Sequence, residues 1–237
     1  MKAIDKALAV RRNWPFKSPD PRIAYRNRTR RAWSILNLVE KHGSPSVRYE
    51  ARRLFIVATC AAFESFWRDI IRDTIDQGGI SLRSAPQLGK VMFSVADVSE
   101  VLGQRLTLGE LVAVAYTFQS PEAVDQALSD VLGIKAFSEF ANWEVVFREV
   151  PRKNRSRKRG PLLKASFKGS VPLKSIPDIH RAFAVRHDTV HDTGARHWLS
   201  GIETNRLAHS VWEFNEFLSL FVERRLETIP TPHRVRR

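Results

Sequence analysis

The stretch SPSVRYEARRLFIVATCAAFESFWRDIIRDTIDQ, residues 44–77, decides the fold of this chain. It opens with Ser44 and Pro45, a cap-type residue followed by the residue favoured at the first helical position, and it contains no later proline and no glycine. Its apolar side chains, from Leu54 to Phe63 and beyond, fall on more than one side of a helix. The stretch predicts a helix about 50 Å long, packed on several sides at the centre of a helical bundle.

Helix signals continue on both sides of this stretch. The residues from Pro21 to His42 predict a helix with a basic flank of five arginines, Arg22, Arg26, Arg28, Arg30 and Arg31. Beyond Gly78 we expect several shorter helices, because residues 107–110 form a capping-box pattern and Ser120-Pro121 is a helix start. No internal repeat and no strong strand alternation is found. The sequence therefore predicts an all-α fold, a single domain over residues 1–237, with core helices at about 22–42, 45–77, 176–191 and 200–228, a helical insertion at about 80–148 and a basic loop at about 149–174.

The composition indicates a globular chain with an excess of positive charge. Lysine and arginine number 39 against 25 aspartates and glutamates, a formal charge of +14. Cys60 is alone, so no disulfide can form within the chain and a reducing compartment is the simplest setting. The longest nearly apolar stretch, Leu54 to Phe63, is half of the roughly 20 residues that a bilayer span needs, and the first residues carry charges where a signal peptide is apolar. We expect a soluble, cytoplasmic protein.

Ionisable residues gather at the end of one predicted helix, in the stretch IHRAFAVRHDTVHD, residues 179–192. The helix begins at Ser175-Ile176-Pro177 and continues to about His191. Within it, Arg186 is followed at once by His187, and four residues separate Arg186 from His191. A break and a long amphipathic helix come after the motif. These residues are the strongest candidates for chemistry in the chain.

This pattern resembles the Arg-polar-x3-His signature of the HEPN superfamily, in particular its RiboL-PSP and MAE-like nuclease groups. In that family the motif lies on the penultimate core helix of an all-α bundle, and an acidic residue tends to sit within the apolar surroundings of an early core helix, as Glu64 does in residues 44–77. The resemblance implies a HEPN-like homodimer in which two copies of the motif meet in one cleft. It also implies a metal-independent endoribonuclease that needs no cofactor, of the kind found in toxin–antitoxin or antiviral defence systems, with an antitoxin or regulatory protein as a possible partner.

The chemistry of the side chains fits that expectation. The imidazole of His191, with an ordinary pKa near 6.5, can take the proton of an RNA 2′-hydroxyl, and Arg186 can stabilise charge on phosphate oxygens. We expect His187 to be an auxiliary polar group and Glu64 to orient Arg186 by a charge-assisted hydrogen bond. Because five residues on a helix place Arg186 and His191 about 140° apart, they do not share a face, and a two-fold partner can supply the missing half of a site.

Two other functions remain open on the sequence alone. A non-catalytic HEPN module could bind RNA or a protein with the same fold. A metal-dependent phosphodiesterase could use His187, His191 and Asp192, although no third ligand stands at a defined spacing and we predict no metal site. Cys60 is expected to be a buried hydrophobe and the tryptophans to lie in the core.

The basic loop is the expected contact region for RNA. Six cations fall within eight residues and can neutralise several phosphates in a salt-sensitive manner. No aromatic residue accompanies them, so the loop would position RNA without reading its sequence. The predicted RNA-binding residues are Arg152, Lys153, Arg155, Arg157, Lys158 and Arg159.

Overall fold

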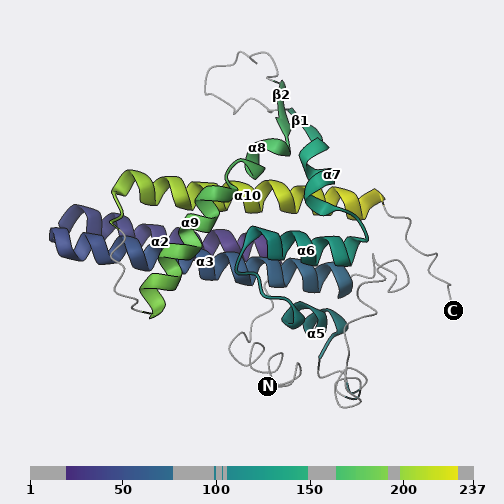
Figure 1. Ribbon diagram of the computed structural model, residues 1–237, viewed down its shortest axis with the longest axis horizontal. Helices are drawn as coiled ribbons and strands as arrows, with labels where there is room; N and C mark the ends of the chain where they lie inside the picture. Colours follow the sequence, from purple (N-terminus) through teal and green to yellow (C-terminus); the bar gives the residue numbers. More distant parts are fainter. Residues whose placement is uncertain are drawn as a thin grey trace, which may run out of the picture.

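The computed structural model describes residues 20–76, 99, 103, 106–148, 164–191 and 198–228. Within these ranges the chain forms eight helices and one small sheet (Figure 1), so the expected helical fold class is confirmed in its coarse form. The elements are α2 (Pro21–His42), α3 (Pro45–Asp76), α5 (Leu108–Ala115), α6 (Pro121–Leu132), α7 (Ala136–Asn142), β1 (Glu144–Arg148), β2 (Lys164–Lys168), α8 (Ser170–Leu173), α9 (Ile176–His191) and α10 (Gly201–Thr228).

The centre of the fold is α3, which packs against α2, α5, α6, α9 and α10. Phe63 and Trp67 are fully buried there, and Trp67 Nε1 donates a hydrogen bond of 2.7 Å to Asn215 Oδ1 of α10. In Figure 1, α3 and α10 run along the length of the molecule and α9 crosses them obliquely. In the described part of the chain, none of the helices is both long and apolar enough to traverse a bilayer.

The expected packing of α3 on several sides is confirmed, but one side of the helix is exposed. Leu54 is 61% exposed, and Ala58 and Ala61, which follow it at helical spacing, are also exposed. The buried positions are the aromatic and branched residues on the remaining sides of the helix, which meet the neighbouring helices. A stripe of short apolar side chains on α3 therefore faces solvent.

Several helix ends form where the sequence predicts them. Asp20 caps α2, where its side chain accepts a hydrogen bond from Arg22 N, and Pro21 takes the first helical position. Thr107 and Glu110 form the expected capping box of α5. Gly133 ends α6 with a φ of 67°, a left-handed conformation that suits glycine.

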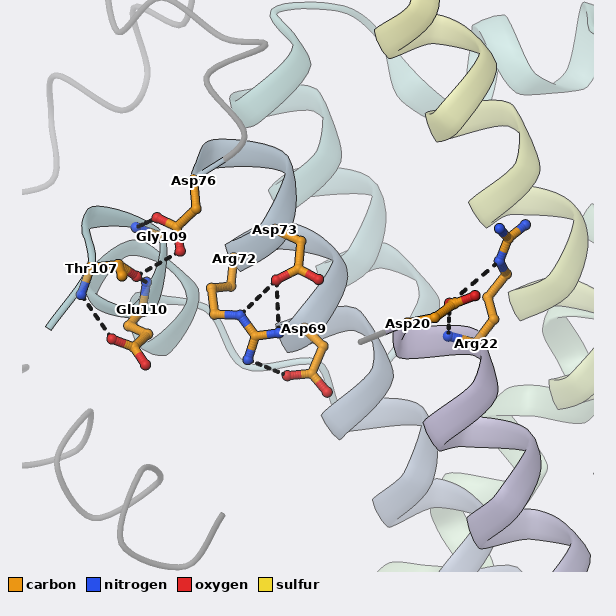
Figure 2. A network of polar contacts seen from close by, with 9 residues as sticks. All are labelled: Asp20, Arg22, Asp69, Arg72, Asp73, Asp76, Thr107, Gly109 and Glu110. Atoms are coloured by element: carbon orange, nitrogen blue, oxygen red, sulfur yellow. Dashed lines mark hydrogen bonds and ion pairs between the residues drawn. The ribbon is translucent and has the colours of Figure 1, made fainter. Parts of the chain in front are cut away.

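A polar junction fixes α5 against the end of α3 (Figure 2). Asp76 accepts hydrogen bonds from Gly109 N at 2.9 Å and from the Thr107 hydroxyl at 2.7 Å. One turn earlier on α3, Arg72 pairs with Asp69 and Asp73. The short α5 thus depends on carboxylates of α3 as well as on its own capping box.

A two-stranded antiparallel sheet corrects the expectation that no strand is present. Strand β1 lies within the predicted helical insertion, and β2 and α8 lie within the predicted loop at 149–174. Val145 pairs with Phe167 in the register, and Phe167 stacks on Phe217 of α10. The β-branched and aromatic residues of these short segments favour extended backbone once a partner strand is beside them. The hairpin projects away from the helices in Figure 1.

Candidate functional site

Helix α9 carries the motif and is held by its apolar side. Ile179, Ala182, Phe183 and Val185 are buried against α3 and α10, as expected for one stripe of a helix. The ring of Phe183 meets the ring of Phe63 edge to face, with centroids 5.4 Å apart. The predicted bounds of this helix, from about residue 176 to His191, are confirmed.

Arg186 lies next to this buried stripe and contacts α3. Its Nη1 atom is 2.9 Å from Oε1 of Glu64, and the side chains of Arg186 and Glu64 are 26% and 15% exposed. Glu64 Oε1 is buried and accepts no hydrogen bond of good geometry, so the contact is an ion pair rather than an aligned hydrogen bond. The expected pairing of Arg186 with Glu64 is therefore present, although the expected hydrogen bond is not formed.

The environment of this ion pair is poor in solvent. Burial raises the pKa of Glu64 above its ordinary value, although the nearby cations of Arg186 and Arg68 act to lower it. Burial also raises the pKa of the Cys60 thiol to about 12, and Cys60 is fully buried. Cys60 is thus a protonated core residue, as expected, and not a nucleophile.

The two histidines of the motif face solvent on another side of α9. His187 and His191 are both exposed, and their ring centroids are 4.7 Å apart with the planes tilted by 48°. Their four-residue spacing places them on one face, whereas Arg186 turns toward α3. Among the described residues of one protomer, the structure thus forms two pairs, Arg186 with Glu64 and His187 with His191, and shows no contact between the guanidinium and either imidazole.

The described residues supply no third ligand for a metal site built on the two histidines. No group of three histidine, cysteine, aspartate or glutamate side chains suited to a metal ion lies in the ranges 20–76, 106–148, 164–191 and 198–228. Asp192, the third residue of that alternative, lies outside the described residues. The structure therefore leaves the metal-dependent alternative without a described third ligand.

An aromatic and cationic cluster near α9 was not predicted. Arg53 Nε of α3 donates a hydrogen bond of 3.2 Å to Thr189 Oγ1 of α9, and the Arg53 guanidinium lies 5.6 Å from the centroid of the Tyr49 ring. Tyr49 in turn stacks on Trp198, with centroids 5.5 Å apart, and Trp198 is 73% exposed. The expectation that the tryptophans lie in the core is correct for Trp67 and wrong for Trp198, Trp33 and Trp212, which are exposed.

The sequence predicts a free basic flank on α2, but two of its arginines are paired in the structure. Arg22 pairs with Glu223 of α10 at 2.6 Å, and Arg26 pairs with Glu216 of the same helix. Neutralisation by α10 therefore removes two cations from the surface that a polyanion could contact.

The other arginines of α2 differ in their exposure. Arg28 Nη1 donates a hydrogen bond of 2.6 Å to the Ser65 hydroxyl of α3, and burial lowers the pKa of Arg28. Arg30 and Arg31 are exposed. The predicted RNA-binding residues from Arg152 to Arg159 lie outside the described residues.

Comparison with known proteins does not assign a family or a function to the chain. No protein family, no curated protein and no solved structure matches the chain. Function is therefore inferred from the residues themselves.

Proposed function

We propose that this protein is a HEPN-like, metal-independent endoribonuclease that acts as a homodimer. The observation that carries the proposal is the placement of Arg186 by Glu64 on the same helix end that exposes His187 and His191. A fixed cation and an accessible imidazole are the two groups that RNA cleavage through the 2′-hydroxyl requires. The contact of Arg186 with Glu64 and the exposure of the two histidines support these roles.

In the proposed reaction the 2′-oxygen of RNA attacks the adjacent phosphorus and the bond from phosphorus to the 5′-oxygen breaks. His191 accepts the proton of the 2′-hydroxyl, a step worth about 10²–10⁴ in rate, and a protonated group supplies a proton to the leaving 5′-oxygen. Arg186 stabilises the negative charge that develops on the phosphate oxygens. The products are a 2′,3′-cyclic phosphate and a 5′-hydroxyl, and DNA is inert because it lacks the nucleophile.

The electrostatics of Glu64 support a functional origin of the ion pair. Burial raises the pKa of Glu64 despite the attraction of Arg186, so the ionised carboxylate costs the folded state free energy. A neutral side chain of the same shape would be tolerated better. A carboxylate held at such a position, next to a specific cation, is typical of a functional site.

The opposed directions of Arg186 and His191 support a site shared by two protomers. The exposed stripe of Leu54, Ala58 and Ala61 on α3 offers an apolar surface for the second copy. Ser65 continues this stripe along α3, and its hydrogen bond with Arg28 brings α2 to the edge of the stripe. On α2, the exposed Ile35 lies two turns after Arg28, on the same side of the helix. These residues form a surface beside the motif helix on which a two-fold axis can lie.

The proposed dimer is tested by measuring whether a substitution on the apolar stripe lowers the molecular mass in solution. Leu54→Arg should convert the protein to a monomer in sedimentation equilibrium, because it places a cation on the proposed apolar contact. Val171→Arg, an exposed valine on the distant α8, is the matched control and should leave the dimer intact. A wild-type protein that sediments as a monomer at micromolar concentration would contradict the shared site.

The test of the chemistry is incubation of RNA with the protein in EDTA, followed by analysis of the product ends. Wild type should leave cyclic phosphates, and His191→Ala and Arg186→Ala should lower the rate by about 10²–10⁴. His180→Ala on the same helix is the control, because His180 is paired with Glu122 outside the motif. Cleavage that requires a divalent ion and leaves 3′-hydroxyl ends would instead indicate the metal-dependent alternative.

Equal amounts of intact RNA with wild type and His191→Ala would identify a non-catalytic binding module. For an active enzyme, expression of wild type should slow growth and expression of His191→Ala should not. That outcome would place the protein among toxins or antiviral defence effectors, which require a neutralising or regulatory partner.

A further inference from the structure

A groove of about 640 Å³ lies between α2 and α10, on a side of the fold that the motif does not use. Phe55 and Thr59 of α3 form its floor. Ile23 and Trp33 of α2 line one wall and Trp212 of α10 lines the other, with 50%, 36% and 38% of their surfaces exposed. Large apolar side chains that remain partly exposed along one depression are typical of a binding surface.

The groove has the dimensions of a short helix. Ile23 and Trp33 stand ten residues apart on α2, which corresponds to about 15 Å of groove length, or nearly three helical turns. Arg26 of α2 pairs with Glu216 of α10 and so joins the two helices that form the walls. A depression of this length between two helices, with an apolar floor, suits an amphipathic helix laid along it.

Charge selects among the possible occupants. Arg26 in the groove is neutralised by Glu216, but Arg30 beside it has no ion pair among the described residues, and the chain as a whole carries a formal charge of +14. A second copy of the chain would bring the same cations into contact with one another. RNA phosphates would have to lose water against aliphatic side chains such as Ile23 and Ala208. An acidic protein segment meets neither penalty.

We propose that the groove binds an amphipathic helix of another protein, with an apolar face against Trp33 and Trp212 and with aspartates or glutamates beside Arg30. This surface is distinct from the motif on α9. Arg206 of α10 faces α9 through its 3.5 Å contact with Asp178, whereas Trp212 faces the groove. A partner in the groove therefore leaves the motif helix uncovered, and its binding does not depend on ribonuclease activity.

The test begins with a random display library of helical peptides selected against the full chain. The enriched sequences should repeat apolar residues at helical spacing and flank them with carboxylates. A synthetic peptide from the selection should bind Ile23→Glu and Trp212→Ala at least about tenfold more weakly than wild type, as expected when a central anchor of an interface is removed. Val171→Glu adds the same charge at an exposed valine on α8, outside the groove, and should bind as wild type does.

A charge exchange tests the acidic character of the occupant. Arg30→Glu should weaken the selected peptide, and a peptide with lysines in place of its glutamates should recover affinity for this variant alone. Peptides that are not acidic, or that bind Ile23→Glu and Arg30→Glu as tightly as wild type, would overturn the proposal, as would a selection that enriches no helix. A single-stranded RNA weakened by Trp212→Ala would assign the groove to nucleic acid, and a dimer that dissociates in Ile23→Glu would assign it to a second copy. Circular dichroism must show that each variant is folded.

Discussion

Arg186 Nη1 lies 2.9 Å from Glu64 Oε1, and this contact joins the second half of α9 to the middle of α3. Both side chains are largely withdrawn from water, and burial outweighs the attraction of Arg186 in setting the pKa of Glu64. The pair is therefore asymmetric in its effect on stability. The carboxylate costs free energy, and the guanidinium reduces that cost.

This asymmetry predicts opposite results for two isosteric changes. Glu64→Gln should leave the free energy of unfolding at pH 7 unchanged within about 1 kcal/mol or raise it, whereas Arg186→Gln should lower it by about 1–3 kcal/mol, because it removes the main cationic partner of a buried carboxylate. The double variant should recover most of that loss. Urea unfolding of all four proteins measures the cycle. If Arg186→Gln is as stable as wild type, the pair does not interact as described.

The pH dependence of stability should distinguish Glu64 from Glu40. Because the pKa of Glu64 is raised on folding, its contribution to stability is full below the ordinary carboxyl pKa of about 4.3 and is lost as the pH rises through the folded value. The pKa of Glu40 is lowered, first by its hydrogen bonds from Arg52, so its contribution is present at neutral pH and is lost as the pH falls.

The free energy of unfolding of wild type minus that of the glutamine variant should therefore change with pH in opposite directions for Glu64 and Glu40. For Glu64→Gln the difference should fall as the pH rises above the ordinary carboxyl pKa of about 4.3, and for Glu40→Gln it should be lost as the pH falls below that value. Thermal or urea unfolding below and above that value gives both curves. Parallel curves would show that Glu64 is not held in a desolvating environment.

Sequence reasoning located α9 because its start and spacing are local signals, and it named Glu64 as the partner of Arg186 through the resemblance to a family with an acidic residue on an early core helix. The Ser175-Ile176-Pro177 start and the apolar spacing fix α9, and a carboxylate in the apolar middle of α3 needs a cation wherever the two helices meet. The bounds of α9 require no knowledge of the rest of the fold, whereas the pairing depends on the contact of α9 with α3.

Other features depend on segments that are distant in the chain. Arg22 and Arg26 are neutralised by Glu223 and Glu216, which the sequence places about 200 residues away, so α2 alone predicts a basic flank that the fold partly removes. Strand β1 is five residues long and gains its partner only across the basic loop. Short strands of this kind take their structure from pairing rather than from local preference.

The close approach of α5 to α3 predicts a strong effect of one added methyl group. A Cβ on Gly109 would lie 2.3 Å from the carbonyl oxygen of Arg72, which is backbone and cannot move aside. Gly109→Ala should therefore lower the free energy of unfolding by about 1–3 kcal/mol. Gly201→Ala is the control, because a Cβ there would meet only the flexible Arg52 side chain at 3.7 Å. Equal stability of the two variants in urea would contradict the described docking of α5.

The basic loop should control RNA affinity without controlling the chemistry. Replacing its six cations with glutamine should weaken binding of single-stranded RNA and reduce the slope of log affinity against log salt by up to about 4, at about 0.7 for each phosphate that the loop no longer neutralises. The cleavage rate at saturating RNA should stay within about threefold of wild type, because Arg186 and His191 remain. Fluorescence anisotropy at several salt concentrations gives the slope, and an unchanged slope would show that the loop does not contact RNA.

Complementation between two inactive variants tests whether the proposed site is shared. Arg186 and His191 point to different sides of α9, so in a shared site the arginine comes from one protomer and the histidine from the other. Unfolding and refolding Arg186→Ala together with His191→Ala should form heterodimers in about half of the molecules, each with one intact site, and restore about a quarter of the wild-type rate. Refolding either variant alone should restore nothing. A mixture no more active than its components would place both residues of a working site in a single protomer.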